Sequence, residues 1–200
     1  MSLSFRFGTV GSPKSTPRSG SANAAAHMPA LGLSALELGW VRSVRVSEKT
    51  CEDIKSAAAK NDVVISVHAP YYINVNGDEE EWPKSRKRLM DAAHYGHLAG
   101  ADYVVFHLGS YGGQEPEAVW THVKERLRGC VDELREAGNP IILRPETMGK
   151  QGQLGSLEDC LQIAKMIKGV EPCLDYAHLH ARPGDGSMNS RKEWLEVLDR

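Results

Sequence analysis

The 200-residue sequence predicts an α/β fold in which helices cover a parallel β-sheet. Short runs rich in β-branched residues alternate six times with helical patterns, as successive βα units do. The strand-like runs start with continuous apolar residues, which is typical of strands buried on both faces. Capping residues, glycine or proline stand where one element gives way to the next. These observations together favour a parallel sheet over an all-α or all-β fold.

Six segments are predicted as strands because β-branched and apolar residues dominate them: 4–10, 35–41, 63–69, 102–109, 141–147 and 171–177. Six further segments show helical periodicity or helix-forming composition: 20–31, 47–60, 80–98, 115–137, 156–169 and 190–200. The alternation fits either a doubly wound open sheet or a (β/α)8 barrel.

The helix boundaries are marked by local signals. Ser47 precedes the second helix and is a typical N-cap. Gly100 and the Gly-Asn-Pro run at 138–140 end the third and fourth helices. Ser156 with Asp159 forms a capping-box pattern at the start of the fifth.

Composition indicates one globular domain over residues 1–200. Hydrophobic residues make up 41% and charged residues 25%, which excludes disorder, a collagen-like chain and a coiled coil. The sequence contains no apolar run near the roughly 20 residues of a membrane span, and its start lacks a secretory apolar region. The four cysteines are scattered and form no CxxC pair. We therefore predict a cytoplasmic protein with reduced thiols.

The loop after the first predicted strand, GTVGSPKSTPRSG, contains neither GxGxxG nor GK[ST]. Nucleotide binding through a glycine-rich phosphate loop is therefore disfavoured.

Polar residues at the ends of successive predicted strands are the main functional signal. His68, His107, Glu146 and Asp175 are separated by 39, 39 and 29 residues, and His178 follows Asp175. These spacings correspond to one βα unit each, so the side chains should meet at the carboxyl ends of the strands. One such histidine is commonly a hydrogen-bonded core residue, but five polar residues in register favour a metal site. Mixed nitrogen and oxygen ligands suit Zn²⁺, Mn²⁺ or Fe²⁺ better than Ca²⁺ or Mg²⁺.

The motifs SVHAPYYINV, VFHLGS, PETMGKQGQLG and CLDYAH resemble the strand-end motifs of the endonuclease IV family of apurinic/apyrimidinic endonucleases. The resemblance covers about residues 60–182. That family belongs to the xylose-isomerase-like superfamily and has a TIM (β/α)8 barrel. The resemblance implies that residues 1–200 form a single TIM-barrel domain with about six βα units. Because this fold needs eight units and typically about 250 residues, we expect the last two units to be missing.

The resemblance also implies a zinc site and a reaction. His68 and His107 would bind a first Zn²⁺, Glu146 would bridge the first and second, Asp175 would bind the second, and His178 a third. Up to three Zn²⁺ ions are expected in the complete barrel, and Mn²⁺ is a possible substitute. The implied activity is that of a deoxyribonuclease IV-type hydrolase in base excision repair. A metal-bridging hydroxide would cleave DNA 5′ to an abasic site. Glu146 would be the catalytic residue that bridges the metals and orients this nucleophile.

The expected partner is double-stranded DNA with abasic sites, and the sequence suggests neither a protein partner nor membrane binding. The net charge of −2 does not by itself indicate nucleic-acid binding. However, the two loops after the first and second predicted strands are basic and should open on the metal site. Contacts to DNA are expected from Lys14, Arg18, Arg42, Arg45, Tyr71 and Asn74.

Two alternatives stay open. A sugar isomerase or epimerase of the same superfamily would use one divalent metal on Glu146, Asp175 and His178, with His68 and His107 acting on sugar hydroxyls. A non-enzymatic DNA-binding or scaffold relative is less favoured, because all five expected ligands of this span are present.

Overall fold

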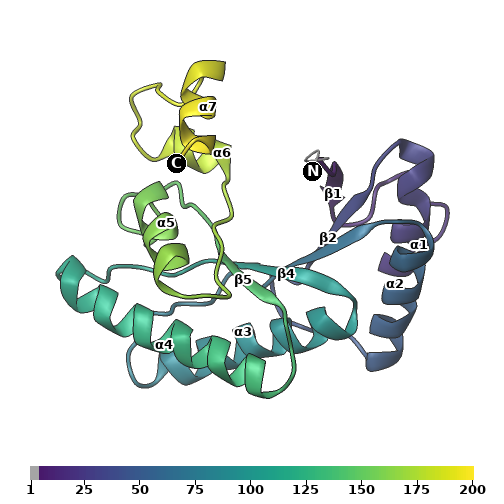
Figure 1. Ribbon diagram of the computed structural model, residues 1–200, viewed down its shortest axis with the longest axis horizontal. Coiled ribbons are helices and arrows are strands. Elements are labelled where there is room, and N and C mark those ends of the chain that lie inside the picture. The colour runs from purple at the N-terminus through teal and green to yellow at the C-terminus, as the bar shows by residue number, and fades with distance from the viewer. Residues whose placement is uncertain (1–4) are drawn as a thin grey trace.

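The computed structural model describes residues 5–200 and contains a five-stranded parallel sheet (Figure 1). The strands are β1 (Gly8–Val10), β2 (Ala35–Gly39), β3 (Val64–His68), β4 (Ala101–Phe106) and β5 (Ile142–Pro145). Their order in the sheet is their order in the sequence, and all four pairings are parallel. In a doubly wound sheet the order of the strands reverses at a switch point, whereas the strands of a barrel follow one another in sequence order. The strand order therefore confirms the predicted barrel architecture for this part of the chain.

The helices follow the predicted pattern with one addition. They are α1 (Ser21–His27), the 3₁₀ helix η1 (Met28–Leu31), α2 (Glu48–Lys60), α3 (Glu81–Leu98), α4 (Pro116–Glu136), α5 (Leu157–Met166), α6 (Tyr176–Ala181) and α7 (Arg191–Leu198). The hydroxyl of Ser47 accepts a hydrogen bond from the backbone of Thr50, as an N-cap should. Both bonds of the predicted Ser156–Asp159 capping box are present.

The prediction of a sixth strand over residues 171–177 is wrong. Backbone hydrogen bonds from Glu171 to Leu143 and from Cys173 to Pro145, with isolated parallel bridges at Val170 and Cys173, pair the start of this segment with the β5 region, but no continuous strand forms. Helix α6 already begins at Tyr176, because the Asp175 carboxylate accepts a hydrogen bond from the His178 backbone and caps it. The first strand is also shorter than predicted. It covers Gly8–Val10 only, and residue 4 lies outside the described residues.

The sheet curves, and α1–α4 cover its outer side (Figure 1). Because side chains alternate along a strand, every second residue points outward into the hydrophobic core. Leu36, Val67, Phe106 and Leu143 are buried in this way. The expectation of burial on both faces is wrong, because the inner face carries half-buried polar residues: Glu37, Ser66, Tyr103 and Arg144.

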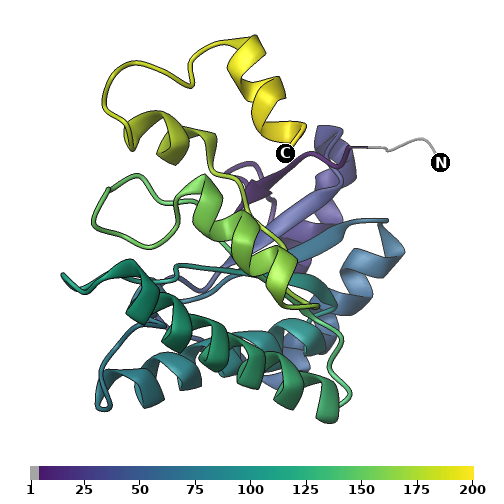
Figure 2. The ribbon, with the colours of Figure 1, turned by 60° about the vertical axis from the view of Figure 1, so that its left-hand side comes forward.

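Helices α6 and α7 lie beyond α5, apart from the layer that α3 and α4 form (Figure 2). No helix among the described residues has the length and apolar character needed to cross a bilayer.

Candidate metal centre

The predicted strand-end residues meet in one cavity. His68 is the last residue of β3, His107 follows β4, and Glu146 follows β5. Asp175 caps α6, and His178 lies in its first turn. All five line a cavity of ≈ 390 Å³. The parallel register explains the convergence, since β3, β4 and β5 end side by side.

Glu146 stands at the centre of this cluster. Its Oε2 lies 3.0 Å from Nε2 of His68 and 3.2 Å from Nε2 of His107. Its other oxygen, Oε1, lies 3.3 Å from Nδ1 of His178, and that nitrogen lies 3.5 Å from Oδ2 of Asp175. Two candidate ligand groups therefore share Glu146: one with His68 and His107, and one with Asp175 and His178. Within each group the ligand atoms lie within 4.8 Å of one another.

The donor atoms fit a divalent metal. Nδ1 of His68 lies 2.8 Å from the carbonyl oxygen of Ala69, which can only accept a hydrogen bond, so Nδ1 carries the proton. Nε2 must then bind a cation, or be protonated too, to approach the Glu146 carboxylate so closely. Zinc bonds of about 2.0–2.1 Å in tetrahedral geometry place neighbouring ligand atoms roughly 3.3 Å apart. The separations of 3.0 and 3.2 Å between Oε2 of Glu146 and Nε2 of His68 and of His107 are close to this value.

The electrostatics of the centre require positive charge beside Glu146, from protonated imidazoles or from a bound cation. Burial alone would raise the pKa of Glu146, which is 7% exposed, but its contacts with His107 and His68 outweigh burial and hold that pKa well below the usual range. Burial lowers the pKa of His68, but the hydrogen bonds to Glu146 and Ala69 and the charges of Glu146 and Glu37 together raise it overall. The centre thus keeps a buried carboxylate charged, and that charge needs a positive partner.

The predicted Tyr71 lies beside the ligands. Its ring stacks on the His107 ring at a centroid distance of 5.1 Å and an interplanar angle of 12°. It meets the His68 ring edge-on at 5.1 Å. The side chain remains 53% exposed, so it forms part of the cavity wall and of the surface at once.

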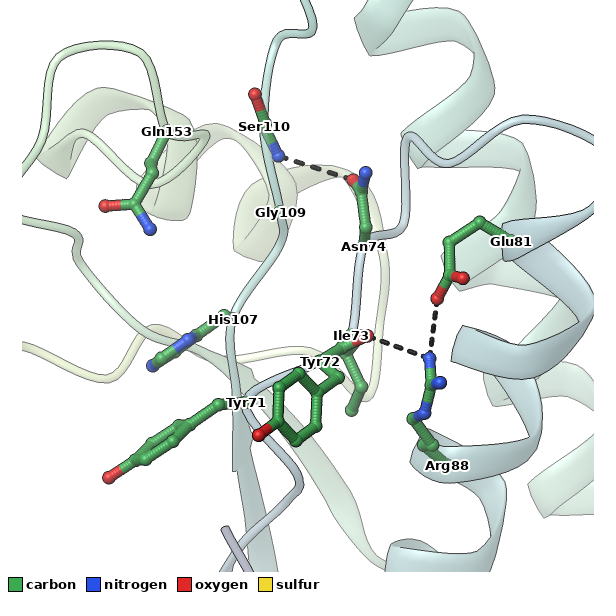
Figure 3. Close-up of a pocket in the computed structure, with 10 residues that line it drawn as sticks. All are labelled: Tyr71, Tyr72, Ile73, Asn74, Glu81, Arg88, His107, Gly109, Ser110 and Gln153. Atoms are coloured by element: carbon green, nitrogen blue, oxygen red, sulfur yellow. Dashed lines mark hydrogen bonds and ion pairs between the residues drawn. The ribbon is translucent and has the colours of Figure 1, made fainter. Parts of the chain in front are cut away.

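Asn74 holds two loops together. Its Oδ1 accepts a hydrogen bond from the backbone N–H of Ser110 (Figure 3). It accepts another from the backbone N–H of Asn76. Gly109 permits this close approach, since a Cβ there would lie 2.0 Å from Oδ1 of Asn74. A role of Asn74 at DNA stays a prediction.

The four predicted basic residues stand apart from the ligands. Lys14 and Arg18 lie in the loop after β1, and Arg42 and Arg45 in the loop after β2. All four are exposed, and none of them lines the ≈ 390 Å³ cavity. Among residues 5–200 none forms an ion pair. Their charges are therefore directed to solvent.

Glu37 is a site residue that the sequence analysis did not identify. It lies on the inner face of β2 and lines the same cavity as the five candidate ligands. Its Oε2 accepts a hydrogen bond of 3.2 Å from Ser66 of the neighbouring strand. Burial raises the pKa of Glu37, and the nearby His68 reduces this effect. The signal was the period-two alternation of ALELG, in which Glu37 is the polar residue between buried leucines.

A second cavity of ≈ 440 Å³ adjoins the centre and shares Tyr71 and His107 with it (Figure 3). Arg88 closes its far side, where it binds the Tyr72 carbonyl at 2.9 Å and Glu81 at 2.6 Å. The two cavities thus adjoin at Tyr71 and His107.

Comparison with known proteins agrees with this geometry. The family model described as xylose isomerase-like TIM barrel matches residues 25–199. An uncharacterised protein of Methanocaldococcus jannaschii is 31% identical over 171 residues, which are 85% of this chain and 61% of that protein. Endonuclease 4 of Thermus thermophilus is 30% identical over 193 residues, which are 92% of this chain and 67% of that enzyme.

A solved structure gives the same result. The crystal structure of endonuclease IV from Thermus thermophilus matches with a TM-score of 0.69 and 27% sequence identity. The match covers 96% of this chain and 68% of that one, so the chain spans about two thirds of the enzyme's length. On these grounds the chain belongs to the xylose isomerase-like TIM-barrel family and is a relative of endonuclease IV.

Proposed function

We propose that this protein is a metal-dependent phosphodiesterase that cleaves DNA 5′ to abasic sites, as a zinc enzyme of base excision repair. The observation that carries the proposal is the sharing of Glu146 between two ligand groups. Such a centre can hold metal ions on both sides of one carboxylate, which suits in-line displacement at phosphorus. The similarity to endonuclease 4 of Thermus thermophilus supports the same choice.

Each ligand has a defined place in the proposal. His68 and His107 would hold a first ion, Asp175 a second, and Glu146 both. Nδ1 of His178 lies 2.9 Å from the Thr147 carbonyl and donates to it, which leaves Nε2 as the nitrogen for a third ion. Bound ions would supply Lewis acidity that activates water and stabilises charge on the phosphate. Zn²⁺ is the proposed metal, and Mn²⁺ is the substitute that these ligands also accept.

Glu146 would orient the nucleophile and would not serve as a free general base. Its pKa lies far below neutrality because His107 and His68 overcome the effect of burial. A carboxylate with such a pKa stays ionised at neutral pH and accepts a proton poorly. Its role is therefore to hold charge at the centre, between the two groups.

The DNA contacts in the proposal come from the rim. Tyr71 borders both cavities and offers an exposed ring beside His107. The exposed Lys14, Arg18, Arg42 and Arg45 would contact phosphates and so position the duplex without reading its sequence. Loss of a base lowers the energy needed to turn a nucleotide out of the helix, which favours an abasic substrate.

A second candidate function is isomerisation or epimerisation of a sugar on a single divalent metal. Glu37 is the observation that favours it, because its carboxylate lines the cavity and would accept hydrogen bonds from sugar hydroxyls. The same charge repels a phosphate. Glu146, Asp175 and His178 would then be the metal ligands.

The test is a cleavage assay with a 5′-labelled duplex that carries one synthetic abasic site. Zinc-loaded protein should produce a single cut 5′ to the lesion with a 3′-hydroxyl, and should leave the undamaged duplex intact. The Glu146→Gln variant should be at least about 100-fold slower. Absence of cleavage, together with turnover of a ketose or aldose panel by the same preparation, would replace the proposal with the sugar reaction.

A further inference from the structure

One arginine gathers the loop that follows the central carboxylate. Arg182 is the C-cap residue of α6 and is half-buried. Its Nη1 donates to the carbonyl oxygens of Met148 (3.1 Å), Lys150 (2.7 Å) and Gln153 (3.2 Å), and its Nη2 donates to that of Gln151 (3.3 Å). In return, the Gln151 side chain donates to the Arg182 carbonyl at 3.4 Å. One guanidinium thus spans four carbonyls of residues 148–153, which we call the Glu146 loop.

The Glu146 loop and α6 carry the ligands that must come together. The loop starts two residues after Glu146, and α6 carries Asp175 as its cap and His178 in its first turn. We call these two residues the α6 ligands. Their distances to Glu146 depend on how α6 sits on the loop.

Helix α6 is attached to residues 147–153 at both of its ends. At the first end, the Asp175 backbone donates to Oγ1 of Thr147 at 2.8 Å, and His178 binds the Thr147 carbonyl. At the second end, Arg182 makes the attachment. Among residues 5–200, hydrogen bonds between α6 with its caps and residues 147–153 are confined to these two places. A six-residue helix has little stability of its own, so both attachments matter for its position.

A glycine allows the helix to sit close. A Cβ at Gly149 would lie 3.2 Å from Cδ2 of His178 and 3.5 Å from Cβ of Ala181. The loop backbone therefore packs directly on α6, without a side chain between them. Gly152, in the same loop, has open space at its Cβ position.

The residues that follow the Glu146 loop, 154–159, are held in place independently of α6. The Tyr111 hydroxyl donates to both oxygens of Asp159 at 3.1 and 2.9 Å. The backbone N–H of Leu154 donates to the Gly109 carbonyl at 3.1 Å. Loss of Arg182 should therefore free the C-terminal end of α6 while the loop itself remains anchored to the segment after β4.

We propose that Arg182 is a positioning residue: it clamps α6 onto the Glu146 loop and so sets the metal affinity of the α6 ligands. The inference rests on the metal centre of the proposed function, but not on its substrate. The guanidinium suits this role because two nitrogens of one rigid plane act together: Nη1 lies within hydrogen-bond distance of three carbonyls and Nη2 of the fourth. A lysine has a single donor nitrogen, so it lacks the second nitrogen that reaches the Gln151 carbonyl.

The experiment measures Zn²⁺ affinity of metal-free protein by competition with a chromophoric chelator. Arg182→Ala should weaken binding at the α6 ligands at least tenfold, and Arg182→Lys should recover only part of it. Binding by the group of His68, His107 and Glu146 should change less than threefold. In an Asp175→Ala/His178→Ala background, which removes the α6 ligands, Arg182→Ala should have no further effect beyond threefold.

A second pair of variants keeps the test valid if Arg182→Ala fails to fold. Gly149→Ala should weaken zinc binding at the α6 ligands, because the new methyl group meets the His178 ring, whereas Gly152→Ala should not. Amide hydrogen exchange of the metal-free protein gives a readout without metal. Residues 177–181 should exchange faster in Arg182→Ala than in wild type.

The inference is overturned if folded Arg182→Ala loses zinc affinity equally at both ligand groups. It is also overturned if Gly149→Ala and Gly152→Ala bind zinc alike. A wild-type protein that binds zinc only through His68 and His107 would overturn it as well. The proposed function fails separately. If zinc binding follows the predicted pattern but abasic DNA is not cleaved, the clamp stands and the nuclease proposal falls.

Discussion

At the scale of single residues, the behaviour of the centre follows from one buried carboxylate surrounded by three imidazoles. Glu146 faces His68 and His107 with one oxygen and His178 with the other. A carboxylate can accept on both oxygens at once, whereas an amide offers only one acceptor. Replacement by glutamine is therefore a sharp change of chemistry at nearly constant volume.

Glu37 distinguishes the two candidate reactions. In a phosphodiesterase, Glu37→Gln removes a charge that repels phosphate, so the KM for abasic DNA should fall and cleavage should slow by no more than threefold. Zinc affinity should fall by less than about tenfold, since Glu37 adds charge near the ions without belonging to either ligand group.

Steady-state kinetics of Glu37→Gln give the answer, with Ser66→Ala as the control, because it removes only the hydrogen bond to Glu37. A loss of more than 100-fold in turnover, with DNA binding unchanged, would assign Glu37 a direct role in chemistry and favour the sugar reaction.

Sequence reasoning located the candidate ligands but not the residues that position them or line the cavity beside them, and the difference has a physical cause. His68, His107 and Glu146 could be located because strand ends recur at the period of a βα unit. Arg182 binds backbone carbonyls, which every residue possesses, so no partner side chain reveals it in the sequence. Glu37 is one polar residue within an alternating strand, a pattern that usually indicates only a solvated face.

At the scale of elements, the segment after β5 shows where pattern and structure diverge. EPCLDYA has the composition of a strand, but Asp175 captures the His178 backbone N–H and starts a helix within it. Local side-chain capping competes with strand pairing, and here the backbone hydrogen bonds to the β5 segment end at Cys173, two residues before the cap. The same aspartate is both cap and candidate ligand.

These two roles of Asp175 can be separated. Asn caps as well as Asp, so Asp175→Asn should change the free energy of unfolding of metal-free protein by less than about 0.5 kcal/mol. Asp175→Ala should lose about 1 kcal/mol because the cap is gone. Both should weaken zinc binding at the α6 ligands at least tenfold. Urea denaturation in EDTA measures the first effect and chelator competition the second; equal destabilisation by both variants would contradict the dual role.

The contact between the loops after β3 and β4 gives a second prediction at this scale. Gly109 has φ +109°, and a Cβ would lie 2.7 Å from Cα of Asn74 as well as against its Oδ1. Gly109→Ala should therefore destabilise the protein by about 2 kcal/mol or more, from strain and overlap together.

Gly113→Ala is the matched control for Gly109→Ala. Gly113 also has positive φ, +72°, but open space at its Cβ position, so it should lose only about 1 kcal/mol. Thermal or urea unfolding gives the loss of stability of each variant, and the difference between the two losses measures the contact between Gly109 and Asn74. Similar losses would mean that the loops are not packed as described.

At the scale of the whole molecule, the parallel architecture was predictable and the character of its inner face was not. Alternating strand and helix patterns lead to a parallel sheet by general rules of connection. On the inner face, Arg144 pairs with Glu171 at 2.6 Å and lies over the Tyr103 ring, and both contacts join residues far apart in the sequence. Such pairings depend on register, which composition does not determine.

The distribution of charge across the molecule predicts how DNA binding depends on salt. Each phosphate contact contributes about 0.9 to the slope of log K against log salt concentration. Arg42→Ala/Arg45→Ala should therefore reduce the slope by up to about 1.8. Lys124→Ala/Lys165→Ala, on exposed positions of α4 and α5, removes the same charge elsewhere and should leave the slope unchanged. Fluorescence anisotropy of abasic duplex from low to moderate salt measures both, and equal slopes for the two variants would place the DNA elsewhere.

The most direct test of the shared carboxylate is the zinc content of protein purified without chelator, determined by plasma mass spectrometry for wild type and Glu146→Gln. Two ligand groups that meet at Glu146 predict at least two zinc ions per wild-type chain and no more than one in the variant. A single ion per wild-type chain, retained in Glu146→Gln, would contradict a centre built around Glu146.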